Sequence, residues 1–167
     1  MLSILLAFPV LFLGTFLQIG VISRLPIGNG IADILLVILA IWAIRSKPGE
    51  SFMWALIAGG FLTFVSAIPF PVYLFCCFFT VMAAGYLRRR ILQSPLLATL
   101  LVVMTASIFY GISNIGVMFV LRTNFELSVV LERFIIPSMI LNLLLCLLLF
   151  PFLNDLSRWV HGDEIYE

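Results

Sequence analysis

Four polar side chains lie within or beside long apolar stretches of this chain, and they are its first candidates for chemistry. They are Gln18, Asp33, Asn114 and Asn142. A lone carboxylate or amide in such surroundings forms hydrogen bonds, and asparagine deep in an apolar helix usually bonds to a neighbouring helix. We therefore favour a bond between helices over a ligand contact for Asn142. Asp33 has two interpretations of equal weight, a carboxylate that stabilises a helix N-terminus and a polar contact between helices.

Gln18 and Asp33 are predicted to share one polar contact. Each is costly in lipid unless it finds a partner. A short turn joins the two stretches that carry them, so their helix ends should lie side by side. A hydrogen bond of this kind contributes roughly 0.6 to 2 kcal/mol in a membrane.

Other reactive groups are few and isolated. The single histidine, His161, lies in the polar C-terminal segment, and Cys76, Cys77 and Cys146 lie in apolar stretches. Cysteine behaves there as a small hydrophobic residue, and the spacing matches neither a metal site nor a structural disulfide. A Ser–His–Asp set, a Walker loop and a glycine-rich dinucleotide turn are missing. We therefore expect a non-enzymatic protein without a cofactor.

Small residues indicate where helices can approach closely. Gly59 and Gly60 lie in the third apolar stretch, and Gly111 to Gly116, with Asn114 between them, lie in the fifth. These glycines serve either contact with the helix of a partner protein or packing within the chain's own helices. The sequence leaves both alternatives open.

The apolar stretches determine the class of protein. Hydrophobic residues make up 63% of the 167 residues and charged residues 10%, with a mean hydropathy of +1.24. A soluble domain of this size cannot bury so much apolar surface, and a net charge of +1 gives no basic field for nucleic acid. We predict a single all-α polytopic membrane domain with about six transmembrane helices. A bilayer core of about 30 Å needs about 20 helical residues, and the predicted spans are 2–22, 31–44, 52–68, 72–87, 96–121 and 131–153, followed by a short cytoplasmic tail at 154–167.

Two of these spans have an alternative interpretation. Residues 52–87 are long enough for two crossings, which we favour over one re-entrant hairpin turned by Pro69 and Pro71. The first stretch has no basic residues before it, so it is predicted to be a retained helix and not a signal peptide.

Basic residues predict the orientation. With a cytoplasmic N-terminus, the inside loops hold six basic residues and the outside loops three: Arg45, Lys47, Arg88, Arg89, Arg90 and Arg158 inside, and Arg24, Arg122 and Arg133 outside. Both termini are therefore predicted to be cytoplasmic. Arg88–Arg90 is interpreted as a topology anchor beside anionic headgroups.

Aromatic residues near the predicted boundaries are interpreted as interface anchors. Trp42, Trp54, Tyr86 and Trp159 fall near the cytoplasmic boundary, and Tyr73 falls near the outer one.

Four passages carry a resemblance to a known family: Phe16–Gln18, Gly30–Val37, Ala58–Leu62 with Ser66 and Pro69, and Asn142–Leu145 with Phe150–Leu153. In this order they resemble the rod-shape-determining protein MreD family, small inner-membrane proteins of the bacterial elongasome. Gly30–Val37 is similar to the family's Pro-Asp-Leu-rich opening of the second helix, with Ala32 where proline is usual. Thr63 stands near the position where the family often carries an acidic residue, so a role of that acid does not transfer.

The resemblance implies a scaffold of the bacterial cell membrane. Such a scaffold binds an MreC-like bitopic protein and other proteins of cell-wall elongation, within membrane lipid. More distantly, the family is similar to the six-helix S-components of energy-coupling-factor transporters, which implies the alternative of a small-molecule-binding membrane subunit. The short outer loops and few polar groups of this chain favour the scaffold.

The predicted topology is testable by cysteine labelling of intact cells in a variant without the three native cysteines. A membrane-impermeant reagent should reach cysteines placed at the Pro69–Pro71 turn and at Thr123–Asn124, because both are predicted to be outside. Cysteines at Arg89 and His161 should react only after the membrane is opened. Labelling of His161 from outside would contradict this topology.

Overall fold

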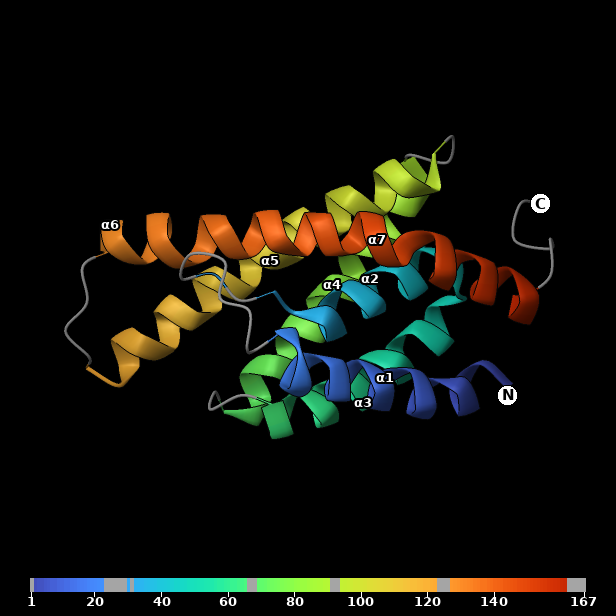
Figure 1. Ribbon diagram of the computed structural model, residues 1–167, viewed down its shortest axis with the longest axis horizontal. Coiled ribbons are helices and arrows are strands. Elements are labelled where there is room, and N and C mark those ends of the chain that lie inside the picture. The colour runs from blue at the N-terminus through green and yellow to red at the C-terminus, as the bar shows by residue number, and fades with distance from the viewer. Residues whose placement is uncertain are drawn as a thin grey trace.

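Helices account for nearly all of the residues that the structure describes, which are 2–22, 30, 32–65, 69–90, 94–122 and 127–161 of the computed structural model. In chain order they are α1 (Leu2–Gly20), α2 (Ile34–Arg45), α3 (Pro48–Val65), α4 (Phe70–Arg90), α5 (Pro95–Val120), α6 (Leu127–Val130), the π-helical turn η2 (Leu131–Ile135) and α7 (Ile136–His161). The all-α fold class predicted from the sequence is confirmed. The segments α6, η2 and α7 follow one another without a break and form one long helix along one side of the molecule (Figure 1).

The helix α2 lies at the centre of the bundle. It packs against α1, α3, α4, α5 and α7, while the pairs α1–α3, α3–α4, α4–α5, α5–α7 and α1–α7 also contact each other around it. All twelve residues of α2 are buried. A helix that is apolar on every side belongs inside a protein or a membrane, so the uniform sequence Ile-Leu-Leu-Val-Ile-Leu-Ala-Ile-Trp-Ala-Ile of α2 fits this central place.

Three of the predicted interface anchors are wrong, because they are buried inside the bundle. Trp42 of α2 and Trp54 of α3 are fully buried, and their rings stack with centroids 4.1 Å apart. Tyr73 is also fully buried, with its hydroxyl 2.8 Å from the hydroxyl of Tyr110. Hydropathy places these aromatic residues near helix ends but does not show which way they face. Tyr86 and Trp159 are 64% and 74% exposed, as the prediction requires.

The helix boundaries differ from the predicted spans mainly around α2, α3 and α7. The described part of the second span begins its helix at Ile34, and α3 begins already at Pro48. Residues 154–161, where the tail was predicted to begin, continue α7, and residues 162–167 lie outside the described part of the chain. Polar side chains hold residues 154–161 against the bundle, because Ser157 is buried and Asn154 accepts a hydrogen bond from Arg45 of α2.

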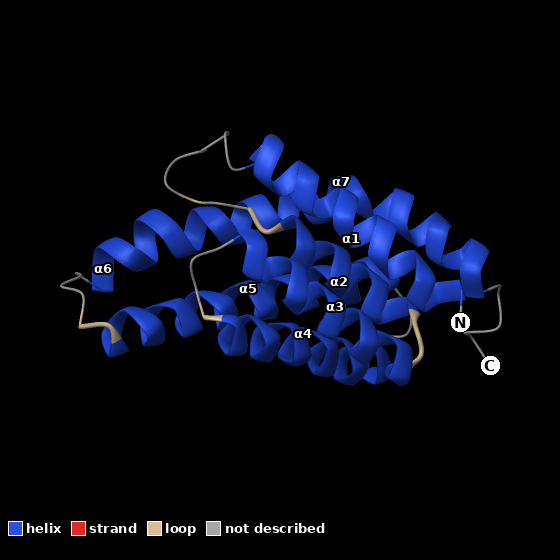
Figure 2. Cartoon of the chain, turned by 90° about the horizontal axis from the view of Figure 1, so that it is seen from below, coloured by secondary structure: helices blue, strands red, loops and turns tan. Residues whose placement is uncertain are grey.

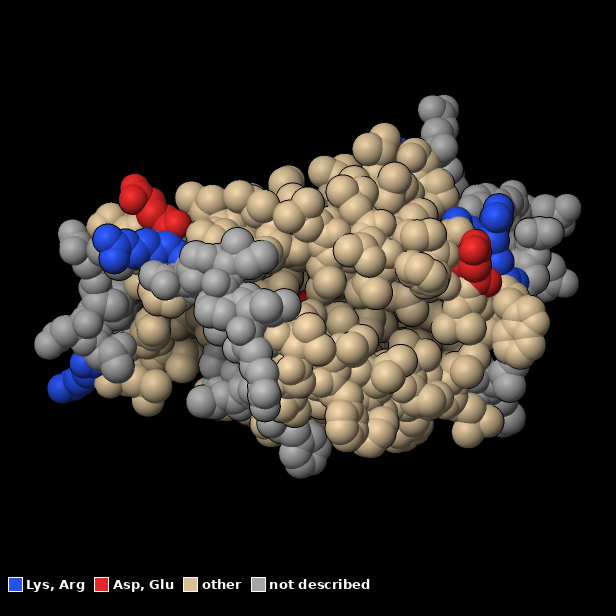
Figure 3. Space-filling view, viewed as in Figure 1, with Lys and Arg blue, Asp and Glu red and all other residues tan. Residues whose placement is uncertain are grey.

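The outer surface of the bundle is apolar between two charged ends. Large hydrophobic side chains such as Phe8, Phe75 and Phe152 are more than half exposed, and the charged side chains visible in Figure 3 gather at both ends of the long axis. Four helical segments are long and apolar enough to cross a membrane: Ser3–Gly20, Phe70–Arg90, Pro95–Val120 and Leu131–Val160. The chain is therefore a multi-pass membrane protein, and the full set of six crossings remains a prediction.

One glycine marks the closest approach between the start of the second span and α7. A Cβ atom at Gly30 would lie 2.6 Å from the backbone nitrogen of Ser138 and 2.7 Å from Cβ of Pro137. A backbone atom and a proline ring cannot rotate out of the way. The glycine therefore lets this segment lie directly on α7.

Gly30→Ala should lower the stability of the purified protein by about 1–3 kcal/mol, the usual cost of overpacking. Gly60→Ala is the matched control, because a Cβ there meets nothing within 4 Å. Thermal unfolding in detergent, followed by circular dichroism, measures both. Equal transition temperatures for the two variants would contradict the close approach.

Candidate functional site

The N-terminus of α2 lies inside the bundle, where its free backbone groups need partners from the protein. The first N–H groups of a helix have no acceptor within it, and leaving one unpaired in a buried place costs free energy. Asp33 is the N-cap of α2, and its Oδ1 atom accepts a hydrogen bond from the backbone nitrogen of Leu36 at 3.2 Å. The interpretation of Asp33 as a helix-stabilising carboxylate is thus confirmed.

Gln18 of α1 holds the chain on both sides of Asp33. Its Nε2 atom donates to the carbonyl oxygen of Ala32 at 2.7 Å, and its Oε1 atom accepts from the backbone nitrogen of Ile34 at 2.9 Å. The side chain of Gln18 is buried. The first two spans therefore meet at Gln18 as predicted, through the backbone of the residues on either side of Asp33. A direct contact between the side chains of Gln18 and Asp33 stays a prediction.

Asn142 of α7 connects the same point to α5. Its Oδ1 atom accepts from the backbone nitrogen of Asp33 at 2.6 Å, and its Nδ2 atom donates to Oγ of Ser107 at 2.9 Å. The predicted role of Asn142 as a bond between helices is confirmed. Asp33 therefore takes part in a polar contact between helices and also stabilises the N-terminus of α2, so both of its interpretations hold. We name Gln18, Asp33, Ser107 and Asn142 the polar junction.

A cavity of about 190 Å³ lies beside the polar junction, between α2, α5, η2 and α7. Asp33, Ser107 and Asn142 line it together with Asn114 and Ser138, and its apolar wall includes Met118, Phe134 and Ile135. Asn114 donates to the carbonyl oxygen of Tyr110 in its own helix at 2.9 Å. The junction and the cavity together offer hydrogen bonds and one carboxylate to whatever enters.

The glycines of the two predicted contact strips separate into internal and open positions. A Cβ at Gly59 would lie 3.0 Å from Leu74, and a Cβ at Gly111 would lie 2.9 Å from Ile135, so both glycines serve packing within the bundle. A Cβ at Gly60 or Gly116 meets nothing within 4 Å. Packing within the bundle is therefore the role of Gly59 and Gly111, while contact with a partner helix stays a prediction for Gly60 and Gly116.

Sequence reasoning missed Ser107 and the Tyr73–Tyr110 pair. A serine in an apolar helix commonly bonds to its own backbone, as Ser113 does with Phe109, so its type and position did not distinguish Ser107. Tyr110 lies one helical turn beyond Ser107 and lines the same cavity. The spacing of these two residues is the only signal in the sequence that points to a shared face.

The side chains around the cavity supply hydroxyl and amide groups and the carboxyl group of Asp33. Among the described residues, no group of three or more His, Cys, Asp and Glu side chains is placed to hold a metal ion. Compared with known protein families, with curated proteins and with solved structures, the chain gives no match. Its function must therefore be inferred from its own residues.

A double-mutant cycle tests the polar junction. We expect Asn142→Ala and Ser107→Ala to be coupled by roughly 0.6–2 kcal/mol, the range of hydrogen bonds between helices in membranes. Unfolding of the single and double variants in mixed micelles measures this coupling. Thr105→Ala is the control partner, because Thr105 bonds to carbonyl oxygens of its own helix and its effect should add to that of Asn142→Ala. Additive effects at Ser107 would show that the junction contributes no coupling.

Proposed function

We propose that this protein is a non-enzymatic scaffold of the bacterial cell membrane that acts by lateral contact between helices. The proposal names the cell-wall elongation machinery as its place of action and an MreC-like bitopic protein as its partner. The resemblance to the MreD family supports both, and the basic residues support an orientation with cytoplasmic termini.

The observation that carries the proposal is a pair of helical segments in which no described residue is buried. We name residues 112–120 of α5, together with α6 and η2, the outer arm. None of the residues from Ile112 to Val120 is buried, the last three of them are 40–79% exposed, and η2 has no buried residue. The outer arm extends beyond α1, α2, α3 and α4 along the long axis (Figures 1 and 2).

Gly116 gives the outer arm a place for close contact. Nothing lies within 4 Å of a Cβ at this position, so the backbone of α5 is accessible to a second helix. Helices in lipid associate through packing at small residues and through hydrogen bonds. One transmembrane helix of a bitopic protein fits this kind of surface.

The cavity beside the polar junction supports a second candidate function, a small-molecule-binding subunit like an energy-coupling-factor S-component. Its polar lining offers the hydrogen bonds that a ligand needs. Its volume of about 190 Å³ is small, however, because pockets for drug-sized ligands measure about 300–1,000 Å³. The cavity is thus small for a drug-sized ligand, so the scaffold is the better supported function.

Native purification followed by mass spectrometry tests the proposal. The protein should co-purify with a bitopic protein and with cell-wall synthesis proteins, and Gly116→Leu should reduce their recovery at least about tenfold, because a bulky residue separates packed helices. Gly60→Leu is the matched control, an equally open glycine on α3, and should retain them.

Three outcomes would count against the proposal. A bound metabolite without wall-synthesis proteins would favour the second candidate function. Full recovery of partners with Gly116→Leu would show that the outer arm is not the contact surface. Loss of partners only with Gly60→Leu would move the contact to α3. Expression of each variant in the membrane must match the wild type for these comparisons.

A further inference from the structure

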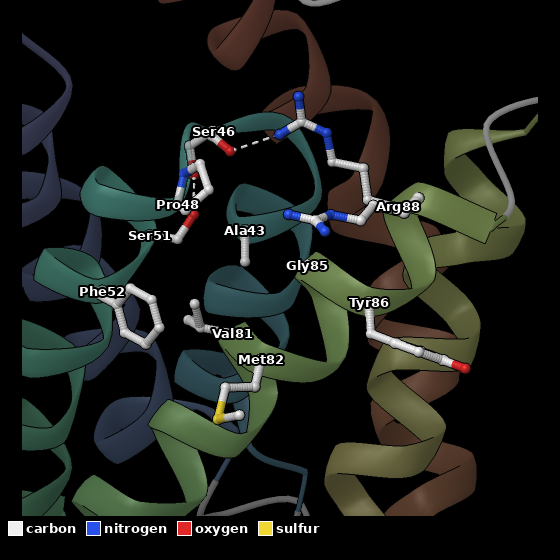
Figure 4. Close-up of a pocket in the computed structure, with 11 residues that line it drawn as sticks. Ala43, Ser46, Pro48, Ser51, Phe52, Val81, Met82, Gly85, Tyr86 and Arg88 are labelled. Carbon is white, nitrogen blue, oxygen red and sulfur yellow. Dashed lines mark hydrogen bonds between the residues drawn. The ribbon is translucent and has the colours of Figure 1, made fainter.

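A second and larger cavity lies at the opposite end of α2 from the polar junction. It measures about 510 Å³ and is bounded by the end of α2, the beginning of α3 and the last turns of α4 (Figure 4). We name it the α3–α4 groove. Its upper end is polar, with Ser46, Ser51 and Arg88, and its lower end is apolar, with Phe52 and Met82.

The polar end of the α3–α4 groove is positively charged. Nη1 of Arg88 donates to the carbonyl oxygen of Ser46 at 2.9 Å, and the other N–H groups of a guanidinium, which has five, remain for further bonds. Arg89, the next residue of α4, lines the same groove and is exposed. Glu50 lies in the first turn of α3 but is not part of the lining. The hydroxyl groups of Ser46 and Ser51 bond to each other at 2.6 Å, and Ser51 also donates to the carbonyl oxygen of Lys47. The donors that suit a phosphate are therefore the two guanidinium groups, since a guanidinium binds phosphate with two parallel hydrogen bonds.

The apolar end of the groove continues onto the outer surface of the bundle. Phe52 and Met82 line it and are 41% and 65% exposed, while Val81 forms part of its buried floor. Gly85 adds space, because a Cβ there meets nothing within 4 Å. The groove is therefore much larger than a phosphate ion requires, and the apolar side chains that line the additional space suit a hydrocarbon chain.

We infer that the α3–α4 groove binds an anionic phospholipid, with the phosphate at Arg88 and Arg89 and an acyl chain along Val81, Met82 and Gly85. The depth fits, because the two arginines end a membrane-length helix of 21 residues, where lipid headgroups lie. This inference does not depend on the proposed function. The inference assigns a specific ligand to Arg88 and Arg89, which the sequence alone explains only as part of a topology anchor.

Native mass spectrometry of the full-length protein in detergent, titrated with phosphatidylglycerol, tests the inference. Arg89→Gln should weaken binding about tenfold or more, the size of one lost charge-assisted hydrogen bond. Arg158→Gln is the matched control, because it removes the same charge from an exposed position on α7 that is not part of the lining of the groove. It should change the affinity by less than about twofold.

Two further arms distinguish a lipid from a free phosphate ion. Gly85→Leu fills the apolar end without changing any charge, so it should weaken phosphatidylglycerol binding as Arg89→Gln does. Inorganic phosphate at millimolar concentration should not displace the lipid, and phosphatidylcholine should bind far less than phosphatidylglycerol.

Each opposite result overturns the inference. Equal losses for Arg89→Gln and Arg158→Gln would reduce the site to general surface charge. Displacement by inorganic phosphate, with no effect of Gly85→Leu, would make it a phosphate-ion site. Equal binding of phosphatidylcholine would remove the role of the headgroup charge.

Discussion

The short central helix α2 is the constraint on which the rest of the structure depends. Its twelve residues span about 18 Å, whereas the hydrocarbon core of a bilayer is about 30 Å thick. Asp33 and Ser46, the residues that flank α2, are both buried, so the free N–H and C=O groups at the ends of the helix need partners from the protein. This requirement explains the buried polar side chains of Gln18, Asp33 and Asn142.

Each end of α2 meets the requirement with residues from other helices. At the N-terminal end, Gln18 from α1 and Asn142 from α7 bind the backbone around Asp33. At the C-terminal end, Arg88 from α4 binds the carbonyl oxygen of Ser46, and Arg45 binds Asn154 of α7. Both cavities lie beside these end points, because a helix that stops early leaves space that the neighbouring helices do not fill completely.

The sequence predicts the positions of the helices, because these depend on hydropathy and length. It does not predict which residues are buried where that depends on the direction in which a side chain points. The apolar stretches located the helices, and the cost of polar groups in lipid identified Gln18, Asp33 and Asn142. The same reasoning misplaced Trp42, Trp54 and Tyr73, because an aromatic residue near a helix end suits the interface and the interior equally. It also treated Gly59 and Gly60 alike, although only Gly59 faces Leu74 of α4, since adjacent residues on a helix point in different directions.

Exposed apolar side chains by themselves do not identify a contact surface in a membrane, because lipid tails are as apolar as leucine. What distinguishes the outer arm is the combination of open space at Gly116 with helical segments in which no described residue is buried. The arm is also connected to the centre of the bundle, since η2 leads directly into α7 and Asn142 of α7 holds the backbone of Asp33. Ile135 of η2, packed on Gly111 of α5, ties the two segments of the arm together. A helix that displaced the arm would therefore act on the N-terminus of α2, where the bundle has its polar junction.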